Sequence, residues 1–294
     1  MKILLTGGSG FFGRNIFEQL KHKYDILNPS STELNLMDKA AVDKYISSNA
    51  FDIVIHSAWW NSTRNSNKDL TKCYENNLGM FTNVTENSSS FGKILYFGTG
   101  AEYGSREHYL PKMTEDYYGK YGPGEESVRA KHDMMKIASQ KPNIINLRAF
   151  AVFGKYEDWE IRYISNAICK TIFDLPITIK RNVFFDYMYI DDLVKITDWF
   201  INSETHYNVY NVCTGKTIDL LSLANIVLKI AHKKLPVVVN APGLNPEYSG
   251  DNSRLMKEIG NFVFSDLESD IAKLYAWYLA NKNLIDRNKL LFDK

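Results

Sequence analysis

A glycine-rich segment near the N-terminus constrains the fold of this chain most. Gly7, Gly10 and Gly13 are spaced as G-x-x-G-x-x-G and directly follow the apolar run 3–5. In a strand–turn–helix unit, the first glycine permits the tight turn, the second lets the backbone approach a pyrophosphate, and the third lets the helix pack on the strand. The helix N-terminus adds free N–H groups and a partial positive charge. The segment therefore predicts a binding site for a dinucleotide.

The first half of the sequence alternates between apolar runs and helical patterns. Strands are expected at residues 2–6, 24–27, 52–56, 93–97 and 144–147. Helices are expected at residues 12–21, 38–48, 70–89 and 125–139. This alternation is typical of an α/β fold with a doubly wound parallel sheet of the Rossmann type, in which ligands bind beyond the carboxyl ends of the strands. We expect residues 1–154 to form a dinucleotide-binding domain.

The regular alternation of predicted strands and helices ends after Gly154. Helices are expected at residues 160–173, 190–202, 220–231 and 265–284, with short strands near 177–179, 209–212 and 236–239. The tripeptide at 241–243, Ala-Pro-Gly, predicts a loop. We expect residues 155–294 to form mainly a smaller α/β substrate-binding lobe that closes over the cofactor domain, with the strand near 209–212 returning to the main sheet.

The bulk composition argues against several classes of protein. The 294 residues are 45% apolar and carry a formal net charge of +1, which predicts neither a nucleic-acid nor a membrane partner. No apolar run approaches the roughly 20 residues that a membrane-spanning helix needs. Cys73, Cys169 and Cys213 are far apart and fit neither a disulfide framework nor a metal site. Because the first strand begins directly after Met1, leaving no room for a signal peptide, we expect a cytoplasmic protein.

Several later segments have the order and composition of one known family. They are Asp38 in the segment 35–38, the strand end His56-Ser57-Ala58, Asn76 in the segment 75–79, Thr99 in the segment 97–104, and the stretches 186–192 and 210–215. Together with the glycine motif, they resemble the extended short-chain dehydrogenases/reductases, a family of nucleotide-sugar epimerases, dehydratases and reductases. The resemblance covers nearly the whole chain. By length and by residues 34–41, the chain is most similar to 4-keto nucleotide-sugar reductases and reductase-epimerases, such as those making GDP-fucose or dTDP-rhamnose.

The resemblance implies a set of cofactor contacts. Asp38 matches the acidic residue that meets the adenine, and Asn76 matches an asparagine in the helix after the third strand. The other implied contacts come from the glycine motif, the end of the third strand and a catalytic lysine: Gly7, Gly10, Phe11, Phe12, Gly13, Ser57, Ala58 and Lys131.

The segment after the second strand bears on the choice between NAD and NADP. Rossmann folds that prefer NAD place an acidic residue there, which holds the ribose 2′-OH. In this chain no carboxylate follows that strand until Glu33. Three polar side chains and one cation are available to a 2′-phosphate instead, namely Asn28, Ser30, Ser31 and Arg14. This pattern favours NADP, with NAD as the alternative.

The resemblance also implies catalytic roles, and one position breaks the pattern. In the family a tyrosine is the acid or base on the sugar oxygen, a lysine four residues later lowers its pKa and holds the nicotinamide ribose, and a Ser or Thr hydroxyl polarises the same oxygen. Lys131 and Thr99 match the lysine and the hydroxyl. Ser127 stands where the tyrosine is expected. The pKa of a serine hydroxyl lies too far above the ~10 of tyrosine for a direct replacement.

Three interpretations of Ser127 remain open at this point. In the first, another residue supplies the proton, and Tyr103 or Tyr121 is the expected stand-in acid, with Tyr118 and Glu126 also nearby in the sequence. In the second, the protein binds the cofactor but performs little redox chemistry. In the third, this version of the chain carries a serine in place of a natural tyrosine.

Two departures from the family pattern concern the substrate. The arginine that usually precedes the aspartate of the stretch 186–192, and that commonly meets the nucleotide phosphates, is Phe185 here. We expect Arg162, Arg181 or Arg254 to take its role, although lone arginines are also typical of ordinary surfaces. Trp59 follows the third strand and is expected either to form a wall beside the ligands or to pack under a loop.

The pattern as a whole predicts an NADP-leaning oxidoreductase that reduces or epimerises a 4-keto nucleotide sugar. One alternative is a nucleotide-sugar epimerase or dehydratase that regenerates a tightly held NAD. Another is a non-catalytic cofactor-binding protein, because of Ser127. The resemblance also implies a homodimer in which the helices at 70–89 and 125–139 pair into a four-helix interface.

Overall fold

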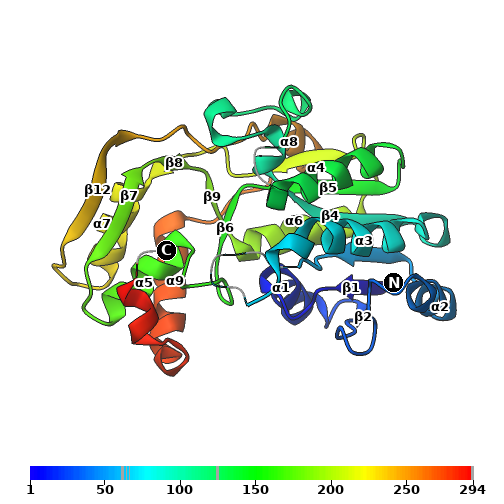
Figure 1. The fold of residues 1–294 in the computed structure, drawn as a ribbon, viewed down its shortest axis with the longest axis horizontal. Coiled ribbons are helices and arrows are strands. Elements are labelled where there is room, and N and C mark those ends of the chain that lie inside the picture. Colours follow the sequence, from blue (N-terminus) through cyan, green and yellow to red (C-terminus); the bar gives the residue numbers. More distant parts are fainter. Residues whose placement is uncertain (61–62, 64, 66, 124–125, 293–294) are drawn as a thin grey trace.

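The computed structural model describes residues 1–60, 63, 65, 67–123 and 126–292, without the side chains of Glu126 and Ser127. Figure 1 shows a larger part built on a parallel sheet and a smaller lobe beside it, which holds α5, α7 and α9. The N-terminus begins the sheet, and the chain ends in the smaller lobe.

The larger part is a six-stranded sheet in the order β10-β5-β4-β3-β1-β2, and every neighbouring pair is parallel. This architecture confirms the predicted α/β fold with a doubly wound sheet. The strand order reverses between β1 and β3, which is where such sheets bind their ligands. The strands are β1 (Lys2–Thr6), β2 (Asp25–Leu27), β3 (Ile53–His56), β4 (Lys93–Thr99), β5 (Ile144–Ala149) and β10 (Val209–Val212).

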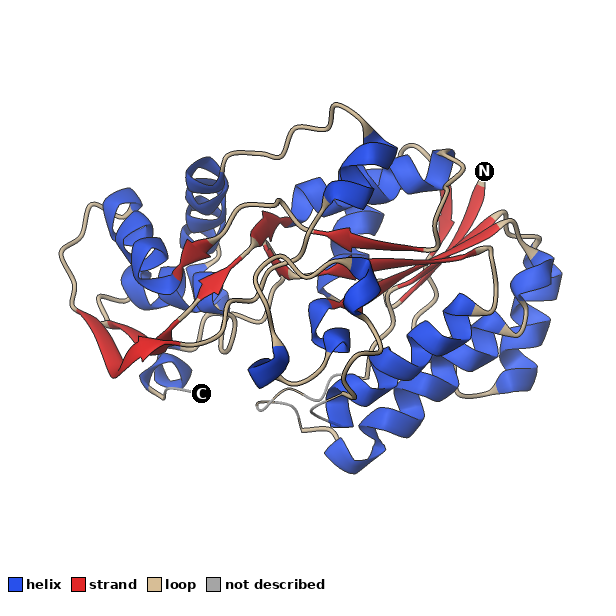
Figure 2. Ribbon diagram, turned by 90° about the horizontal axis from the view of Figure 1, so that it is seen from above, coloured by secondary structure: helices blue, strands red, loops and turns tan. Residues whose placement is uncertain are grey.

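Successive side chains of each strand point to opposite faces of the sheet, and helices cover both faces (Figure 2). In β1, Ile3 and Leu5 pack with α1 and α6, whereas Leu4 packs on the other face with α2, α3 and α4. Both faces are apolar, as expected for parallel strands that are buried between two layers of helices. The covering helices are α1 (Phe11–Leu20), α6 (Ile190–Asn202), α2 (Lys39–Asn49), α3 (Cys73–Thr85) and α4 (Glu126–Ser139).

The smaller lobe packs three helices beside short strand pairs. Its helices are α5 (Tyr163–Ile172), α7 (Leu220–Ile230) and α9 (Leu267–Ala280). Its pairs are the parallel β7 (Ile177–Asn182) with β12 (Val237–Leu244) and the antiparallel β8 (Phe184–Phe185) with β11 (Ile218–Asp219). A third pair, β6 (Ala151–Phe153) with β9 (Tyr187–Tyr189), carries the chain between the two parts.

The prediction of a loop at residues 241–243 is wrong. This segment lies inside β12, where the pairing with β7 shifts register between Ala241 and Leu244 and Gly243 has φ of 80°. Such an irregularity lets a strand carry a proline without a ladder hydrogen bond at that position. The proline–glycine signal therefore marks a bulge in a strand rather than its end.

The second half of the chain contributes to the larger part as well as to the lobe. Strand β10 pairs with β5, α6 packs against α1, and α8 (Ser253–Ile259) packs against β10. Segments from both sides of residue 154 therefore build the larger part.

Candidate active site

The turn after β1 and the loop after β3 touch at the point where the strand order reverses. Gly7 has φ of 73°, and a Cβ on it would lie 2.5 Å from the backbone of Ala58. A Cβ on Gly13 would lie 2.3 Å from the Gly7 carbonyl oxygen, and the Gly10 amide donates to that same oxygen at 3.0 Å. This backbone cradle at the start of α1 fits a dinucleotide pyrophosphate, because amide groups and glycine Hα atoms leave room for phosphate oxygens. Phe11 and Phe12 begin the helix and pack on its core side.

Asn77 of α3, the residue after the predicted cofactor contact Asn76, holds the loop after β3. The Asn77 side chain is buried; it accepts from the Trp60 amide at 2.6 Å and donates to the Trp60 carbonyl at 3.2 Å. Asn76, one residue earlier, is half-buried. The four-residue spacing of buried positions in α3, from Cys73 to Asn77 to Phe81, is the signal that separates the two asparagines.

Lys131 lies in α4 under the loop after β3. Its ammonium donates to the Phe97 carbonyl oxygen and lies 4.4 Å from the ring centre of Trp59. Burial lowers the pKa of Lys131 to about 8. Trp59, which belongs to this loop, therefore covers the ammonium group of Lys131 on α4. Ser127 belongs to the first turn of α4, one turn before Lys131, and its side chain lies outside the described residues.

Thr99 ends β4 and caps the 3₁₀ turn Gly100–Tyr103. Its amide donates to the Glu102 carboxylate at 2.9 Å, and its hydroxyl receives the Ala101 amide at 3.4 Å. This reciprocal capping fixes the direction of the hydroxyl. The hydroxyl of Tyr248 lies 3.1 Å from Thr99 Oγ1. No local sequence motif indicates that Tyr248 belongs to the site, because it lies in an irregular segment between β12 and α8.

A buried ion pair lies directly beneath Thr99. Arg148 Nε donates to Glu102 Oε2 at 2.9 Å, and both side chains are fully buried. Arg148 also donates to the Tyr103 hydroxyl at 2.7 Å, and that hydroxyl donates to Asn211 of β10 at 2.7 Å. Burial raises the pKa of Tyr103 far above its ordinary value. Tyr103 is therefore a structural residue, and the expectation that it is the stand-in acid is wrong.

The other tyrosines considered for that role are also engaged elsewhere. Tyr121 is exposed and stacks on His108 with ring centres 3.9 Å apart. It is not among the described residues that line the cavity at Thr99. Tyr118 donates to the His132 carbonyl at 2.7 Å. The structure therefore brings neither of them to the Thr99 hydroxyl.

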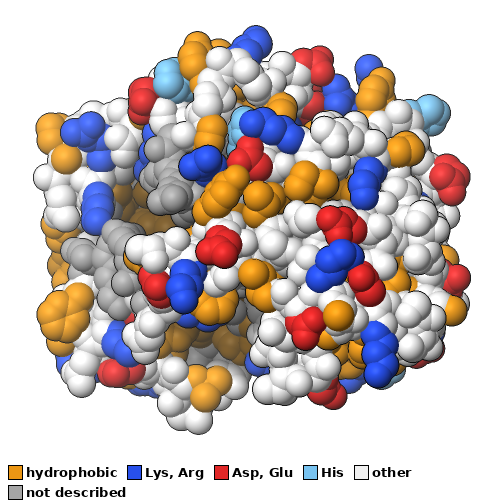
Figure 3. Space-filling view, turned by 45° about the vertical axis from the view of Figure 1, so that its right-hand side comes forward, with side chains coloured by type: hydrophobic (Ala, Val, Ile, Leu, Met, Phe, Trp, Pro, Cys, Tyr) orange, Lys and Arg blue, Asp and Glu red, His pale blue; other side chains and the backbone are white. Residues whose placement is uncertain are grey.

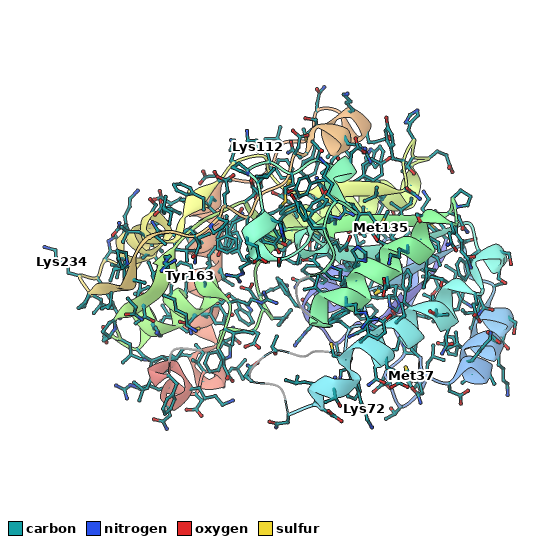
Figure 4. The ribbon with its side chains drawn as sticks, turned by 45° about the horizontal axis from the view of Figure 1, so that its top comes forward. Met37, Lys72, Lys112, Met135, Tyr163 and Lys234 are labelled. Carbon is teal, nitrogen blue, oxygen red and sulfur yellow. The ribbon has the colours of Figure 1, made fainter. Side chains whose placement is uncertain are left out.

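Two adjoining cavities open between the parts of the molecule. The first, of about 600 Å³, is lined by Thr99, Tyr248 and Val128, which adjoins Ser127. The second, of about 460 Å³, is lined by four cationic side chains, namely Arg106, Arg162, Lys180 and Arg181. The two cavities share four residues: Arg106, Arg162, Val183 and Phe185. Figure 4 shows Tyr163, which also lines the second cavity, on α5 in the smaller lobe, and Met135 on α4 in the larger part.

Of the three arginines expected at the substrate, Arg162 and Arg181 line the cavities and Arg254 does not. Arg254 pairs with Asp116 at 3.1 Å and Glu115 at 3.6 Å, and its guanidinium lies over Tyr207. The expectation for Arg254 is therefore wrong, because acidic and aromatic neighbours near α8 already hold its charge.

Two contacts, one in the loop after β2 and one in α1, argue against the sequence pattern that favours NADP. The Ser30 amide donates to the Glu33 carboxylate at 2.7 Å, and these contacts lower the pKa of Glu33. Arg14 pairs with Glu18 at 3.3 Å and lies over Tyr156, so the expectation that it meets a 2′-phosphate is not supported. Residues 24–38 contain no lysine or arginine. Asn28 lies against Gly8, Ser31 is exposed, and Asp38 caps α2 by accepting from the Ala41 amide at 3.0 Å.

Comparison with known proteins decides the family. Residues 3–213 match the model of the NAD dependent epimerase/dehydratase family. The chain belongs to this family. Its members are NAD(P)-dependent enzymes that modify nucleotide sugars as epimerases, dehydratases and reductases. The glycine cradle described above fits that cofactor.

Relatives match along nearly the whole chain. GDP-L-colitose synthase of Yersinia pseudotuberculosis is 27% identical over 319 residues, which cover 96% of this chain and 99% of that protein. The GDP-mannoheptose C4 reductase of Campylobacter jejuni, solved with NADP bound, has a TM-score of 0.80 at 18% identity and covers 94% of this chain and 98% of that one. The Bordetella bronchiseptica enzyme WbmG, solved with NAD, has a TM-score of 0.80 at 22% identity over 95% and 94% of the two chains. The two structures share the fold of this chain.

Among the described residues, no group of three or more His, Cys, Asp or Glu side chains is arranged to hold a metal ion. None of the helices described is long and apolar enough to span a bilayer. On the face drawn in Figure 3, cationic and acidic side chains lie interspersed.

We predict that Gly13→Ala weakens cofactor binding about tenfold or more, because the new Cβ would lie 2.3 Å from the Gly7 carbonyl oxygen and displace the turn. Fluorescence titration with NADH and NADPH measures the two dissociation constants. Gly122→Ala is the matched control, since nothing lies within 4 Å of its Cβ direction. Unchanged dissociation constants for both cofactors in Gly13→Ala would contradict the cradle.

We predict that Arg148→Met lowers the free energy of unfolding by about 3–5 kcal/mol, because it leaves the Glu102 carboxylate buried without its partner. The double variant Glu102→Gln/Arg148→Met removes both charges and is expected to lose less. Urea denaturation at neutral pH compares the three proteins. A single variant as stable as the double variant would show that the buried charge is not what the arginine balances.

Proposed function

We propose that the protein reduces a 4-keto nucleotide sugar with NAD(P)H. The observation that carries this proposal is the joined pair of cavities, one with the Thr99 and Tyr248 hydroxyls and one with four cationic side chains. A volume of about 600 Å³ lies in the range of small-molecule sites. The hydroxyl-lined cavity suits a sugar ring, and guanidinium groups suit the oxygens of a diphosphate.

Each residue of the site has a role in this proposal. Gly7, Gly10 and Gly13 hold the pyrophosphate of the cofactor, whose nicotinamide supplies the hydride when bound. Thr99 donates a hydrogen bond to the keto oxygen, where negative charge develops during reduction. Lys131 adds positive charge beneath the loop after β3. The names of two of the three relatives above include a GDP-sugar, which supports a nucleotide sugar as substrate.

Two alternatives predict different behaviour. A nucleotide-sugar epimerase or dehydratase would keep NAD through purification; the Glu33 carboxylate, folded back onto Ser30, favours a ribose 2′-OH over a 2′-phosphate and supports this alternative. A non-catalytic binder would hold the cofactor without turnover, which the serine at position 127 would explain. We also propose a cytoplasmic homodimer that pairs α3 and α4, which lie side by side in the fold.

We predict that the protein oxidises NADPH or NADH in the presence of at least one 4-keto nucleotide sugar from a panel of GDP-, UDP- and dTDP-linked ketones. Absorbance at the nicotinamide band measures the rate, with Ser127→Tyr assayed side by side. Turnover of the unmodified chain means that another residue supplies the proton. Turnover of the tyrosine variant alone would mean that Ser127 marks a disabled redox site, and silence of both would contradict the reductase.

We predict that Glu33→Gln raises the affinity for NADPH a few-fold relative to NADH, because it removes a carboxylate from the loop that faces the ribose in this fold. Equilibrium fluorescence titration gives the ratio of the two dissociation constants. Glu86→Gln, on the surface at the end of α3, is the control and keeps the ratio unchanged. If Glu33→Gln leaves the ratio as it was, this carboxylate does not contribute to the choice of cofactor.

A further inference from the structure

A ketone reduction needs a proton donor, and the serine at position 127 is not an adequate one. Tyr103, Tyr118 and Tyr121 are engaged elsewhere, as described above. The tyrosine whose hydroxyl touches Thr99 is Tyr248, at 3.1 Å from Thr99 Oγ1, and it lines the hydroxyl-bearing cavity. This contact joins the end of β4 to a segment 149 residues later in the sequence.

The backbone on both sides fixes the position of Tyr248. Its amide donates to the Phe184 carbonyl at 2.9 Å, and its carbonyl accepts from the Asp186 amide at 3.2 Å. The next residue, Ser249, accepts from the Met113 amide at 3.3 Å through its carbonyl. The irregular segment is therefore bound to two other segments and presents its tyrosine from a fixed position.

Gly100 makes room for the Tyr248 hydroxyl, and Gly250 makes room for the neighbouring Phe150 ring. A Cβ on Gly100 would lie 2.8 Å from the Tyr248 hydroxyl oxygen, and a Cβ on Gly250 would lie 2.5 Å from the ring of Phe150. The Phe150 ring lies 5.1 Å from that of Tyr248, and Phe185 packs on another side at 5.7 Å. Aromatic rings therefore pack against Tyr248, which is half-buried, and its hydroxyl lies against that of Thr99.

We propose that Tyr248 is the proton donor of this enzyme, in place of the tyrosine missing at position 127; the inference rests on the proposed reductase function. The carbonyl carbon gains a hydride from a reduced nicotinamide dinucleotide, and the carbonyl oxygen gains the proton of the Tyr248 hydroxyl. The products are a secondary alcohol and the oxidised dinucleotide. The Tyr248 phenolate then takes a proton from water. Thr99 holds the same oxygen through its hydroxyl.

Burial keeps the Tyr248 hydroxyl protonated near neutral pH. Burial raises the pKa of Tyr248 to about 12, the hydrogen bond with Thr99 lowers it, the nearby Glu102 carboxylate raises it and Arg162 lowers it. Arg106 and Glu107 also line the cavity and bring charges of opposite sign. The hydroxyl is therefore protonated at neutral pH, which suits an acid that acts on a ketone better than a base that acts on an alcohol.

The first experiment compares Tyr248→Phe with the unmodified protein on the ketone that it reduces best. Loss of a general acid is expected to lower kcat about 100-fold or more. KM and the dissociation constant for NADPH stay within about threefold, because the ring and its packing remain. Tyr24→Phe is the matched control, because it removes a hydrogen-bonded tyrosine hydroxyl away from the site, the one that donates to Asp198 at 2.6 Å, and it is expected to keep full activity. Adding Ser127→Tyr to Tyr248→Phe is expected to restore part of kcat.

The second experiment places a fluorine next to the Tyr248 hydroxyl and follows it both by NMR and through the pH dependence of kcat. Site-specific 3-fluorotyrosine at position 248 is followed by ¹⁹F NMR, with GDP-mannose and UDP-glucose as separate probes in the absence of cofactor. The resonance is expected to move when a probe that fits the site binds. The electron-withdrawing fluorine lowers the phenol pKa, so the basic limb of the kcat profile is expected to move to lower pH.

The outcomes separate the inference from the function on which it rests. A Tyr248→Phe variant that keeps kcat within threefold of an active parent overturns the role of Tyr248 and leaves the reductase standing. That role is overturned in the same way if neither probe moves the ¹⁹F resonance in a preparation that reduces the ketone. If neither the parent protein nor Ser127→Tyr reduces any ketone of the panel, both proposals are overturned, and turnover by Ser127→Tyr alone overturns the role of Tyr248.

Discussion

The Arg148–Glu102 ion pair organises the carboxyl end of the sheet. It joins β5 to the turn after β4 at 2.9 Å, with both side chains fully buried. Removing two charges from water is costly, so the pair is stable only because further polar partners surround it: the Thr99 amide, Asn146 and the Tyr103 hydroxyl. The direction of the Thr99 hydroxyl therefore depends on charges beneath the sheet end. A substitution in this ion pair would therefore change the orientation of Thr99 although neither residue of the pair contacts a ligand.

The site also depends on the return of the second half of the chain to the sheet. Strand β10 extends the sheet beside β5, and the segment through Tyr248 crosses back to Thr99 from the smaller lobe. The cofactor cradle belongs entirely to the first half, whereas the hydroxyl pair needs both halves. Because the two cavities lie where these halves meet, a nucleotide sugar bound there would contact both.

The sequence predicted those elements that are determined by residues close together in the chain. The strands of the sheet and the glycine motif follow from periodicity and from residues within a short segment, whereas Thr99 and Lys131 were expected only because the chain resembles the family. Tyr248 was missed because its place depends on tertiary pairing with segments about 60 and 135 residues earlier, at Phe184 and Met113, and no motif encodes that pairing. Arg254 was misplaced for the same reason, since its acidic partners come from a distant turn.

The site is tested most directly by a crystal structure with NAD(P)H and a nucleotide sugar that carries a hydroxyl at its reacting carbon. We expect this oxygen to lie within hydrogen-bond reach of both Thr99 Oγ1 and Tyr248 Oη, about 2.6–3.2 Å away, with the diphosphate beside Arg162. A sugar oxygen out of reach of both hydroxyls, or one held by Ser127 instead, would contradict this expectation.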